Sequence, residues 1–200
     1  PALVLAALPR DMGPSPGRCL TATRVGIEVL GYWDIQAIPQ VTAALAANAA
    51  WVEWRGQEWE QGLEEEMPDE AWSVAAGFTV TDSPGLDAHV VIVTGGELLD
   101  LDAGQASRPD KGILIPLTTR LPWDPVRGAA TDLEGGGVLV YLPHQDPPRF
   151  RGSPDWRRAG DSRLAGTAIR VVRHAIEGMT RPLLGVTNLA TEDGRDDDDR

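Results

Sequence analysis

One segment near the middle of the chain leaves few folds open to it. Residues 88–102 read AHVVIVTGGELLDLD, two apolar runs separated by the pair Gly95-Gly96. Two adjacent glycines accept the positive φ angles that a tight β-hairpin turn requires. The segment therefore predicts a hairpin, and a hairpin with two apolar strands needs further antiparallel strands or a helix to cover it.

The open end of this hairpin carries two polar residues. His89 opens the first strand, six residues before Gly95, and Asp100 closes the second, four residues after Gly96. Folding at the turn brings the two side chains together within a residue or two of register. Asp102 would share the strand face of Asp100, so it competes with Asp100 as the partner of His89.

The only cysteine, Cys19, begins a predicted helix over residues 19–30 that ends at Gly31. A thiol in the first turn of a helix is favoured as thiolate by the unpaired N–H groups and the helix dipole. A histidine in reach supplies a base, and a carboxylate orients it. Each residue also has an ordinary interpretation: Cys19 as a small buried hydrophobe, His89 as the polar end of a strand and Asp100 as a residue that flanks a turn.

The remaining elements are predicted from hydrophobic periodicity and from the positions of proline and glycine. Residues 106–137 contain four prolines and are expected to be mostly turns. The predicted regular elements are a strand from about Ile35 that Pro39 places at an edge or bulge, a strand over 71–80, a strand over 136–143 and an amphipathic helix over 161–178.

Residues 49–72 hold four of the seven tryptophans in an acidic stretch without a clean period. The segment is interpreted as a long surface excursion whose tryptophans pack against the rest of the domain. The alternative is a lid or binding loop, because long irregular loops often carry function. The tryptophans are Trp51, Trp54, Trp59 and Trp72.

Composition limits the class of protein. The 200 residues fit one domain, expected over 1–190, with an acidic tail at 191–200. The net charge of −12 argues against binding to nucleic acid or anionic membranes. A single cysteine, no long apolar run and no secretory-type start predict a cytoplasmic protein without disulfides. No metal motif is present, and no cofactor is expected; the oligomeric state is left open.

Two segments resemble a known superfamily. GRCLTATRVGIEVLGYWDIQAIP and DAHVVIVTGGELLDLDAGQASRP are similar to the nucleophile helix and the His- and Asp-bearing strands of transglutaminase-like and arylamine N-acetyltransferase-like proteins. The resemblance covers roughly residues 17–45 and 72–109. It implies an α+β, papain/transglutaminase-like core, with the nucleophile helix packed on an antiparallel sheet.

The same resemblance implies Cys19, His89 and Asp100 as a catalytic triad, followed by Gln105 and Arg108-Pro109. No oxyanion-hole side chain is recognisable upstream of Cys19. The expected activity is thiol-dependent acyl transfer or amide hydrolysis on a protein, peptide or small acyl substrate. The alternative is an inactive binding, structural or assembly protein that keeps the fold. The candidate substrate-binding residues are Trp51, Trp54, Trp72 and Gln105.

Overall fold

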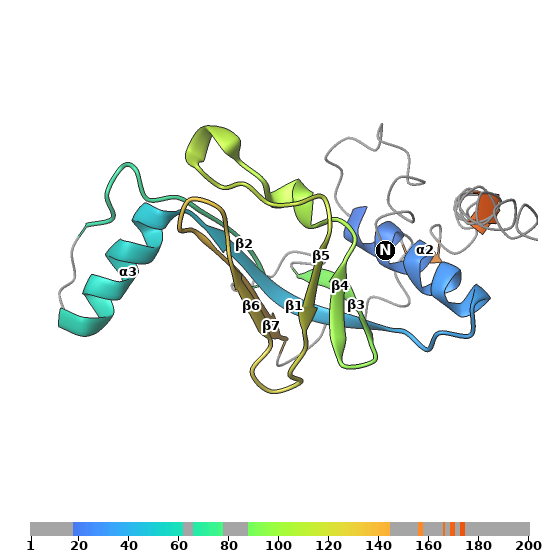
Figure 1. The fold of residues 1–200 in the computed structure, drawn as a ribbon. Helices are drawn as coiled ribbons and strands as arrows, with labels where there is room; N and C mark the ends of the chain where they lie inside the picture. The colour runs from blue at the N-terminus through green and yellow to red at the C-terminus, as the bar shows by residue number, and fades with distance from the viewer. Residues whose placement is uncertain are drawn as a thin grey trace, which may run out of the picture.

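The computed structural model describes residues 18–61, 66–77 and 88–144, together with 156–157, 166, 169–170 and 173–174. This part of the chain is an α+β fold (Figure 1). Its helices are α2 (Arg18–Tyr32), α3 (Ala49–Gln61) and the short 3-10 turns η1 (Ala103–Ala106) and η2 (Pro109–Lys111). Its strands are β1 (Ile38–Ala47), β2 (Ser73–Ala76), β3 (His89–Thr94), β4 (Glu97–Asp100), β5 (Thr119–Pro122), β6 (Ala129–Asp132) and β7 (Val138–Pro143).

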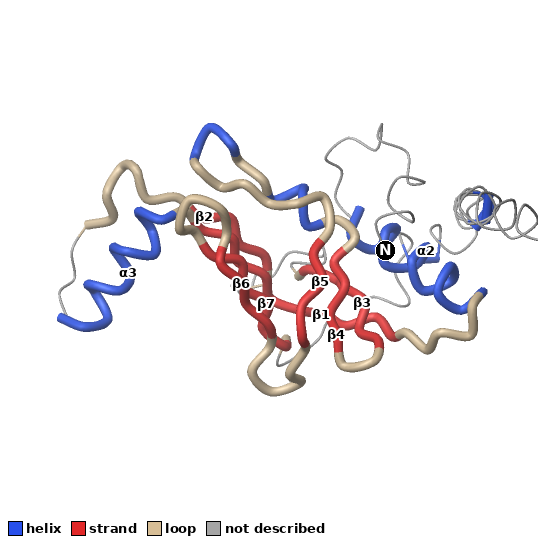
Figure 2. The backbone as a smooth tube through the Cα atoms, in the orientation of Figure 1, coloured by secondary structure: helices blue, strands red, loops and turns tan. Residues whose placement is uncertain are grey.

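The strands form one antiparallel, nearly closed sheet. Their order is β5-β4-β3-β1-β7-β6, and β2 is a further partner of β1. The outermost strands, β5 and β6, follow each other in sequence across a turn bridged by Asp124 and Gly128. This turn brings the two ends of the sheet together, as the strand traces in Figure 2 show. The expected α+β class with an antiparallel sheet is therefore confirmed.

The central strand, β1, has two successive partners on one side. β7 pairs with residues 42–47 on the other side, while β2 pairs with 44–47 and β3 with 38–42. Pro39 is predicted to place this strand at an edge or a bulge; β1 is central over residues 42–47, but among the described residues it has the single partner of an edge position at Pro39. Pro39 lies opposite Ile92, in the part of β1 that pairs with β3 alone among the described residues, so its missing N–H costs no ladder bond to a second strand.

Gly77 ends β2 beside the start of β3. Its φ angle is 76°, and a Cβ there would approach Ala43 Cα at 3.1 Å and Ala88 Cα at 3.3 Å. Only glycine fits this close approach at a positive φ without strain. Gly77 thus lies between Ala43 of β1 and Ala88, the residue that immediately precedes His89.

The helix α2 packs on β3 and β1, with Leu20, Val25 and Val29 almost fully buried. The residues of β3 alternate between two cores. Val90 and Ile92 pack on the α2 side, whereas Val91 packs inside the curved sheet. Because side chains alternate along a strand, His89 shares the inner face with Val91.

The predicted hairpin, the helix from Cys19 and the strand near 136–143 are confirmed as β3–β4, α2 and β7. Residues 106–137 are mostly turns and irregular structure, as expected, but they also contain β5 and β6, four residues each, too short for a clear alternation between the surrounding prolines. One expectation is wrong, because residues 49–61 form α3 in place of an irregular excursion.

A tertiary cap explains α3. The side-chain oxygen of Asn48 accepts the N–H groups of Trp51 and Trp72, and its amide donates to the carbonyls of Glu70 (2.7 Å) and Lys111 (2.9 Å). An N-cap that also binds two distant segments stabilises a helix whose own periodicity is weak. α3 projects from the end of the sheet opposite α2 (Figure 1).

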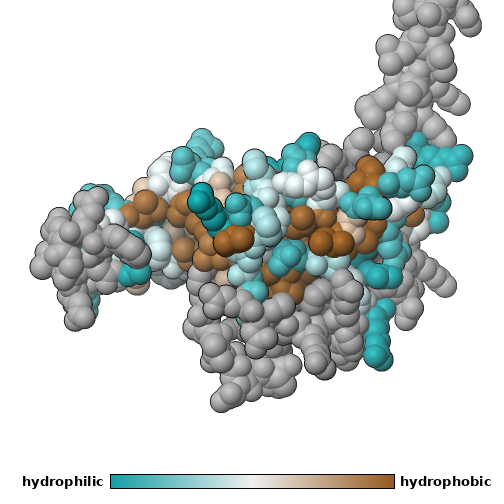
Figure 3. Space-filling model, turned by 90° about the horizontal axis from the view of Figure 1, so that it is seen from below, coloured by the Kyte–Doolittle hydropathy of each residue, from teal (hydrophilic) through white to brown (hydrophobic). Residues whose placement is uncertain are grey.

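The predictions for the C-terminal part fall largely outside the described residues. Residues 166, 169–170 and 173–174 of the predicted helix are helical, and the tail at 191–200 is not described. No helix in the described part combines the length and apolar character that a membrane span requires. Seen from below, apolar side chains reach the surface between polar ones along the body (Figure 3).

Candidate active site

The β3–β4 hairpin brings His89 and Asp100 into contact. Its register pairs Ile92 with Leu99, which by continuation sets Asp100 opposite Val91 and diagonal to His89 on the inner face. His89 Nε2 lies 2.7 Å from Asp100 Oδ2. The two side chains are 8% and 2% exposed, so the pair is withdrawn from solvent.

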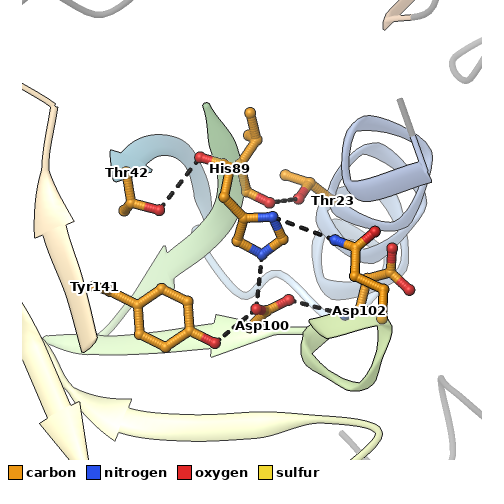
Figure 4. Close-up of polar contacts among 8 residues, drawn as sticks. Thr23, Thr42, His89, Asp100, Asp102 and Tyr141 are labelled. Carbon is orange, nitrogen blue, oxygen red and sulfur yellow. Dashed lines mark hydrogen bonds and ion pairs between the residues drawn. The ribbon is translucent and has the colours of Figure 1, made fainter. Parts of the chain in front are cut away.

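Two further donors hold the Asp100 carboxylate (Figure 4). Tyr141, on β7, donates its hydroxyl to Oδ2 at 2.7 Å, and the backbone N–H of Asp102 donates to Oδ1 at 2.9 Å. The Tyr141 ring also stacks on the His89 ring, with centroids 6.2 Å apart and planes at 29°. Each carboxylate oxygen is therefore engaged, and the imidazole orientation is restrained from two directions.

Burial and pairing have opposite effects on the pKa values of this pair. Burial lowers the pKa of His89, but the charge and hydrogen bond of Asp100, with a smaller contribution from Cys19, raise it well above 6.5 overall. Burial raises the pKa of Asp100, but His89, Tyr141 and the Asp102 amide lower it below its usual value. The pair is therefore an imidazolium and a carboxylate at neutral pH.

Tyr141 stays a hydrogen-bond donor over the same range. Burial and the Asp100 charge raise the pKa of its hydroxyl far above its usual value. The phenol proton is consequently retained whenever Asp100 is ionised, and the short contact between them remains a charge-assisted hydrogen bond.

Cys19 is the second residue of α2 and lies beside the His89 imidazole. Its side chain is one of the causes that raise the pKa of His89. Because Nε2 is bonded to Asp100, Nδ1 is the ring nitrogen left for the thiol. The sulfur-bearing side chain is 9% exposed and packs in a cluster with Leu20, Val41, Ala88, Val90 and Trp156.

Two threonines fix the position of β3 between its neighbours (Figure 4). Thr23, on α2, donates to the Val90 carbonyl at 2.8 Å, and Thr42, on β1, donates to the His89 carbonyl at 3.2 Å. Both hydroxyls are buried. The first bond ties the helix that carries Cys19 to the strand that carries His89, four residues after Cys19 and one residue after His89.

Asp102 does not take the role that its spacing allowed. β4 ends at Asp100, and Asp102 has φ −134° and ψ 19° as the residue that precedes η1. The two side chains therefore do not follow strand alternation. Among the described contacts, it is Asp100 that bonds His89, and Asp102 acts through its backbone N–H.

A cavity of about 360 Å³ adjoins the pair, and Gln105 lines it together with His89 and Asp100. The Gln105 amide nitrogen lies 3.5 Å from His89 Nδ1. The tryptophans proposed for substrate binding lie elsewhere. Trp51 and Trp54 are on α3, and Trp72 stacks under the Lys111 ammonium at 4.1 Å.

The sequence did not identify Tyr141 as part of this site. It lies 41 residues from Asp100, inside the apolar run of β7, where an aromatic residue indicates core packing. No local motif marks a phenol whose partner is supplied by another strand. The signal available was only that a buried tyrosine needs a partner for its hydroxyl.

Within the described residues, no three His, Cys, Asp or Glu side chains converge as metal ligands. Comparison of the chain with protein-family models, characterised proteins and solved structures finds no match. The chemistry of the site is therefore inferred from its own geometry.

Proposed function

We propose that the chain is a thiol-dependent acyl transferase or amide hydrolase with a transglutaminase-like core, in which Cys19, His89 and Asp100 act together. One observation supports this most: a buried imidazole held by a carboxylate on one nitrogen lies against the only thiol of the chain. The packing of the Cys19 helix on an antiparallel sheet supports the same assignment.

The reaction uses the two imidazole nitrogens separately. In the reactive form the Cys19 proton resides on Nδ1 of the His89 imidazolium, and the thiolate sulfur attacks the substrate carbonyl carbon to form a tetrahedral oxyanion. The intermediate collapses as the imidazolium returns its proton to the leaving group, leaving a thioester on Cys19. Water or an amine, deprotonated by Nδ1, then releases the acyl group. Asp100 keeps Nε2 protonated throughout.

The oxyanion needs donors on the thiol side of the imidazole. The backbone N–H of Cys19 is one. Gln105 is our candidate for the second, because its side-chain amide lies 3.5 Å from Nδ1 and is exposed, so it is able to turn toward a bound carbonyl. The second oxyanion donor would then come from a residue that follows Cys19 in the sequence, where none was recognisable upstream of it.

A second candidate is a binding or structural protein that keeps the fold without the chemistry. The packing of Cys19 favours it, since a thiol that is 9% exposed among apolar side chains also serves as a small core residue. The two candidates differ in the reactivity of the folded thiol.

The deciding experiment is the rate of iodoacetamide labelling at pH 6, followed by intact mass. Cys19 is the single cysteine, so each label reports that thiol. In urea the thiol is almost entirely protonated at this pH and labels slowly. Faster labelling in the folded protein, abolished by His89→Gln, is the expected result for an active pair.

His174→Gln is the matched control, because His174 is exposed on a helical turn outside the site. It should label as the wild type does. All variants should label alike in urea, which excludes differences in reagent or handling. If the folded wild type labels no faster than the urea-unfolded chain, the thiol is a packing residue and the second candidate is correct.

A further inference from the structure

The cavity beside His89 is roomy because small side chains line it. Alanines from β1, β2 and η1 face it where larger apolar residues would fill it, and a methyl group reaches only a short way from the backbone. Its volume of about 360 Å³ falls at the lower end of the range for small-molecule sites. These alanines are Ala44, Ala46, Ala76, Ala103 and Ala106.

Val74 and Leu139 extend this apolar lining, and the other side chains of the wall are polar. His89, Asp100 and Tyr141 are each more than nine-tenths buried, and their rings and carboxylate converge on one another (Figure 4). Gln105 and Arg108, both exposed, complete the polar part of the lining. A ligand that fills the cavity therefore meets apolar side chains in one direction and the His89–Asp100 pair in the other.

Arg108 is held in place by its surroundings. Its backbone exchanges two hydrogen bonds with Ile113, at 2.8 and 3.0 Å. One guanidinium nitrogen, Nη1, donates to the carbonyls of Gln105 (2.9 Å) and Ser107 (2.7 Å). Two anchored ends limit the movement of this long side chain, so little entropy is lost when it binds a ligand.

The charge facing the cavity is positive. Among the described residues, the ion pairs join Arg24 to Glu28, His89 to Asp100 and Arg120 to Glu97, and none involves Arg108. The Asp100 charge is matched by His89, which leaves the guanidinium as the unbalanced charge of the lining. Among the described contacts the guanidinium donates through Nη1, and its further N–H groups suit it to a carboxylate.

We propose that this cavity binds a small acyl donor that joins a compact aliphatic group to a carboxylate. The aliphatic group packs on the alanines, the carboxylate binds Arg108, and the reacting carbonyl lies at Gln105 and His89. The inference rests on the proposed function in so far as this ligand is the substrate, whereas the binding itself requires no reaction.

The test is an NMR titration of the Cys19→Ser variant, which reports binding without turnover. The probes are N-acetyl-leucine, N-acetyl-leucinamide and N-acetylglycine. N-acetyl-leucine is expected to bind about tenfold more tightly than its amide, the difference for one hydrogen bond to a charged group. N-acetylglycine, which lacks the aliphatic group, should also bind more weakly.

Two pairs of variants assign the effect to the cavity. Arg108→Gln should remove the preference for acid over amide, whereas Arg127→Gln, at an exposed turn outside the cavity, should keep it. Ala76→Leu should fill the cavity and abolish binding. Ala75→Leu, its neighbour on the exposed face of β2, should not. Each variant is first checked for a folded, dispersed spectrum.

Equal binding of acid and amide, or an acid preference that survives Arg108→Gln, overturns the proposal. So does binding that survives Ala76→Leu. A peptide ending in leucine that binds more tightly than N-acetyl-leucine would identify a chain end as the source of the ligand, and weaker binding would identify a free small molecule. Failure of the thiol-labelling experiment leaves this binding result intact, so the two inferences fail separately.

Discussion

The hydroxyl of Tyr141 offers the sharpest test of how the site is held together. Tyr141→Phe removes one donor from Asp100 Oδ2 and leaves the ring in place, 1% exposed. A hydrogen bond to a buried charged group contributes about 1.5–3 kcal/mol. Because His89 and the Asp102 amide still bond the carboxylate, we expect the lower end of this range, about 1.5 kcal/mol.

The loss should depend on pH in a defined direction. The pKa of Asp100 is lowered in the folded protein, so its contribution to stability is present above about 3.8 and is lost as pH falls through the folded value. A loss of about 1.4 kcal/mol from the ionised form corresponds to a rise of about one unit in the pKa of Asp100. The difference between wild type and Tyr141→Phe should therefore be full at pH 6 and should vanish in strong acid.

The assay is urea unfolding followed by tryptophan fluorescence at a series of pH values. Tyr32→Phe is the matched control, because Tyr32 is 51% exposed, and it should change the free energy of unfolding by no more than a few tenths of a kcal/mol. A cost for Tyr141→Phe no larger than this control, or a cost that does not change with pH, would refute the reasoning.

Three other predictions follow from the structure. The difference in the free energy of unfolding between wild type and His89→Gln, measured by urea unfolding at each pH, should be largest between about pH 3.8 and 6.5. This difference should be lost as pH rises through the raised pKa of His89, and also as pH falls through the lowered pKa of Asp100. Asn48→Ala removes four side-chain hydrogen bonds and should cost on the order of 3 kcal/mol with loss of helical circular dichroism, while Gln57→Ala on exposed α3 should cost little. Gly128→Ala and Gly135→Ala share a φ of 85°, but only the former Cβ overlaps the Tyr141 carbonyl, so it should lower the melting temperature much further; equal shifts would contradict this.

The local elements of this fold could be predicted from the chain itself. The Gly95-Gly96 turn and its two apolar runs form β3–β4 as expected, and the helix from Cys19 is α2. Both depend on neighbours within a few residues, where turn chemistry and periodicity determine conformation. The proximity of His89 and Asp100 follows from the same hairpin, which explains why this part of the candidate site was accessible.

Other features depend on partners far away in sequence. α3 forms where periodicity is weak because Asn48 binds Glu70 and Lys111, segments that only the folded chain brings to it. The choice of Asp100 over Asp102 depends on where β4 ends. Neither the formation of α3 nor the choice of Asp100 over Asp102 is indicated by nearby residues, since asparagines and aspartates in similar local sequences occur in many loops.

The sequence by itself determined which residues are candidates for chemistry: one thiol, one imidazole and two carboxylates at the ends of predictable elements. The tertiary structure decided which of them meet, placing Asp100 under His89 and Tyr141 on Asp100 from β7, and it opened a cavity lined by alanines with Arg108 in its wall. The physical reason is that backbone conformation follows from near neighbours, whereas pairing, burial and empty volume arise only where distant strands close on one another.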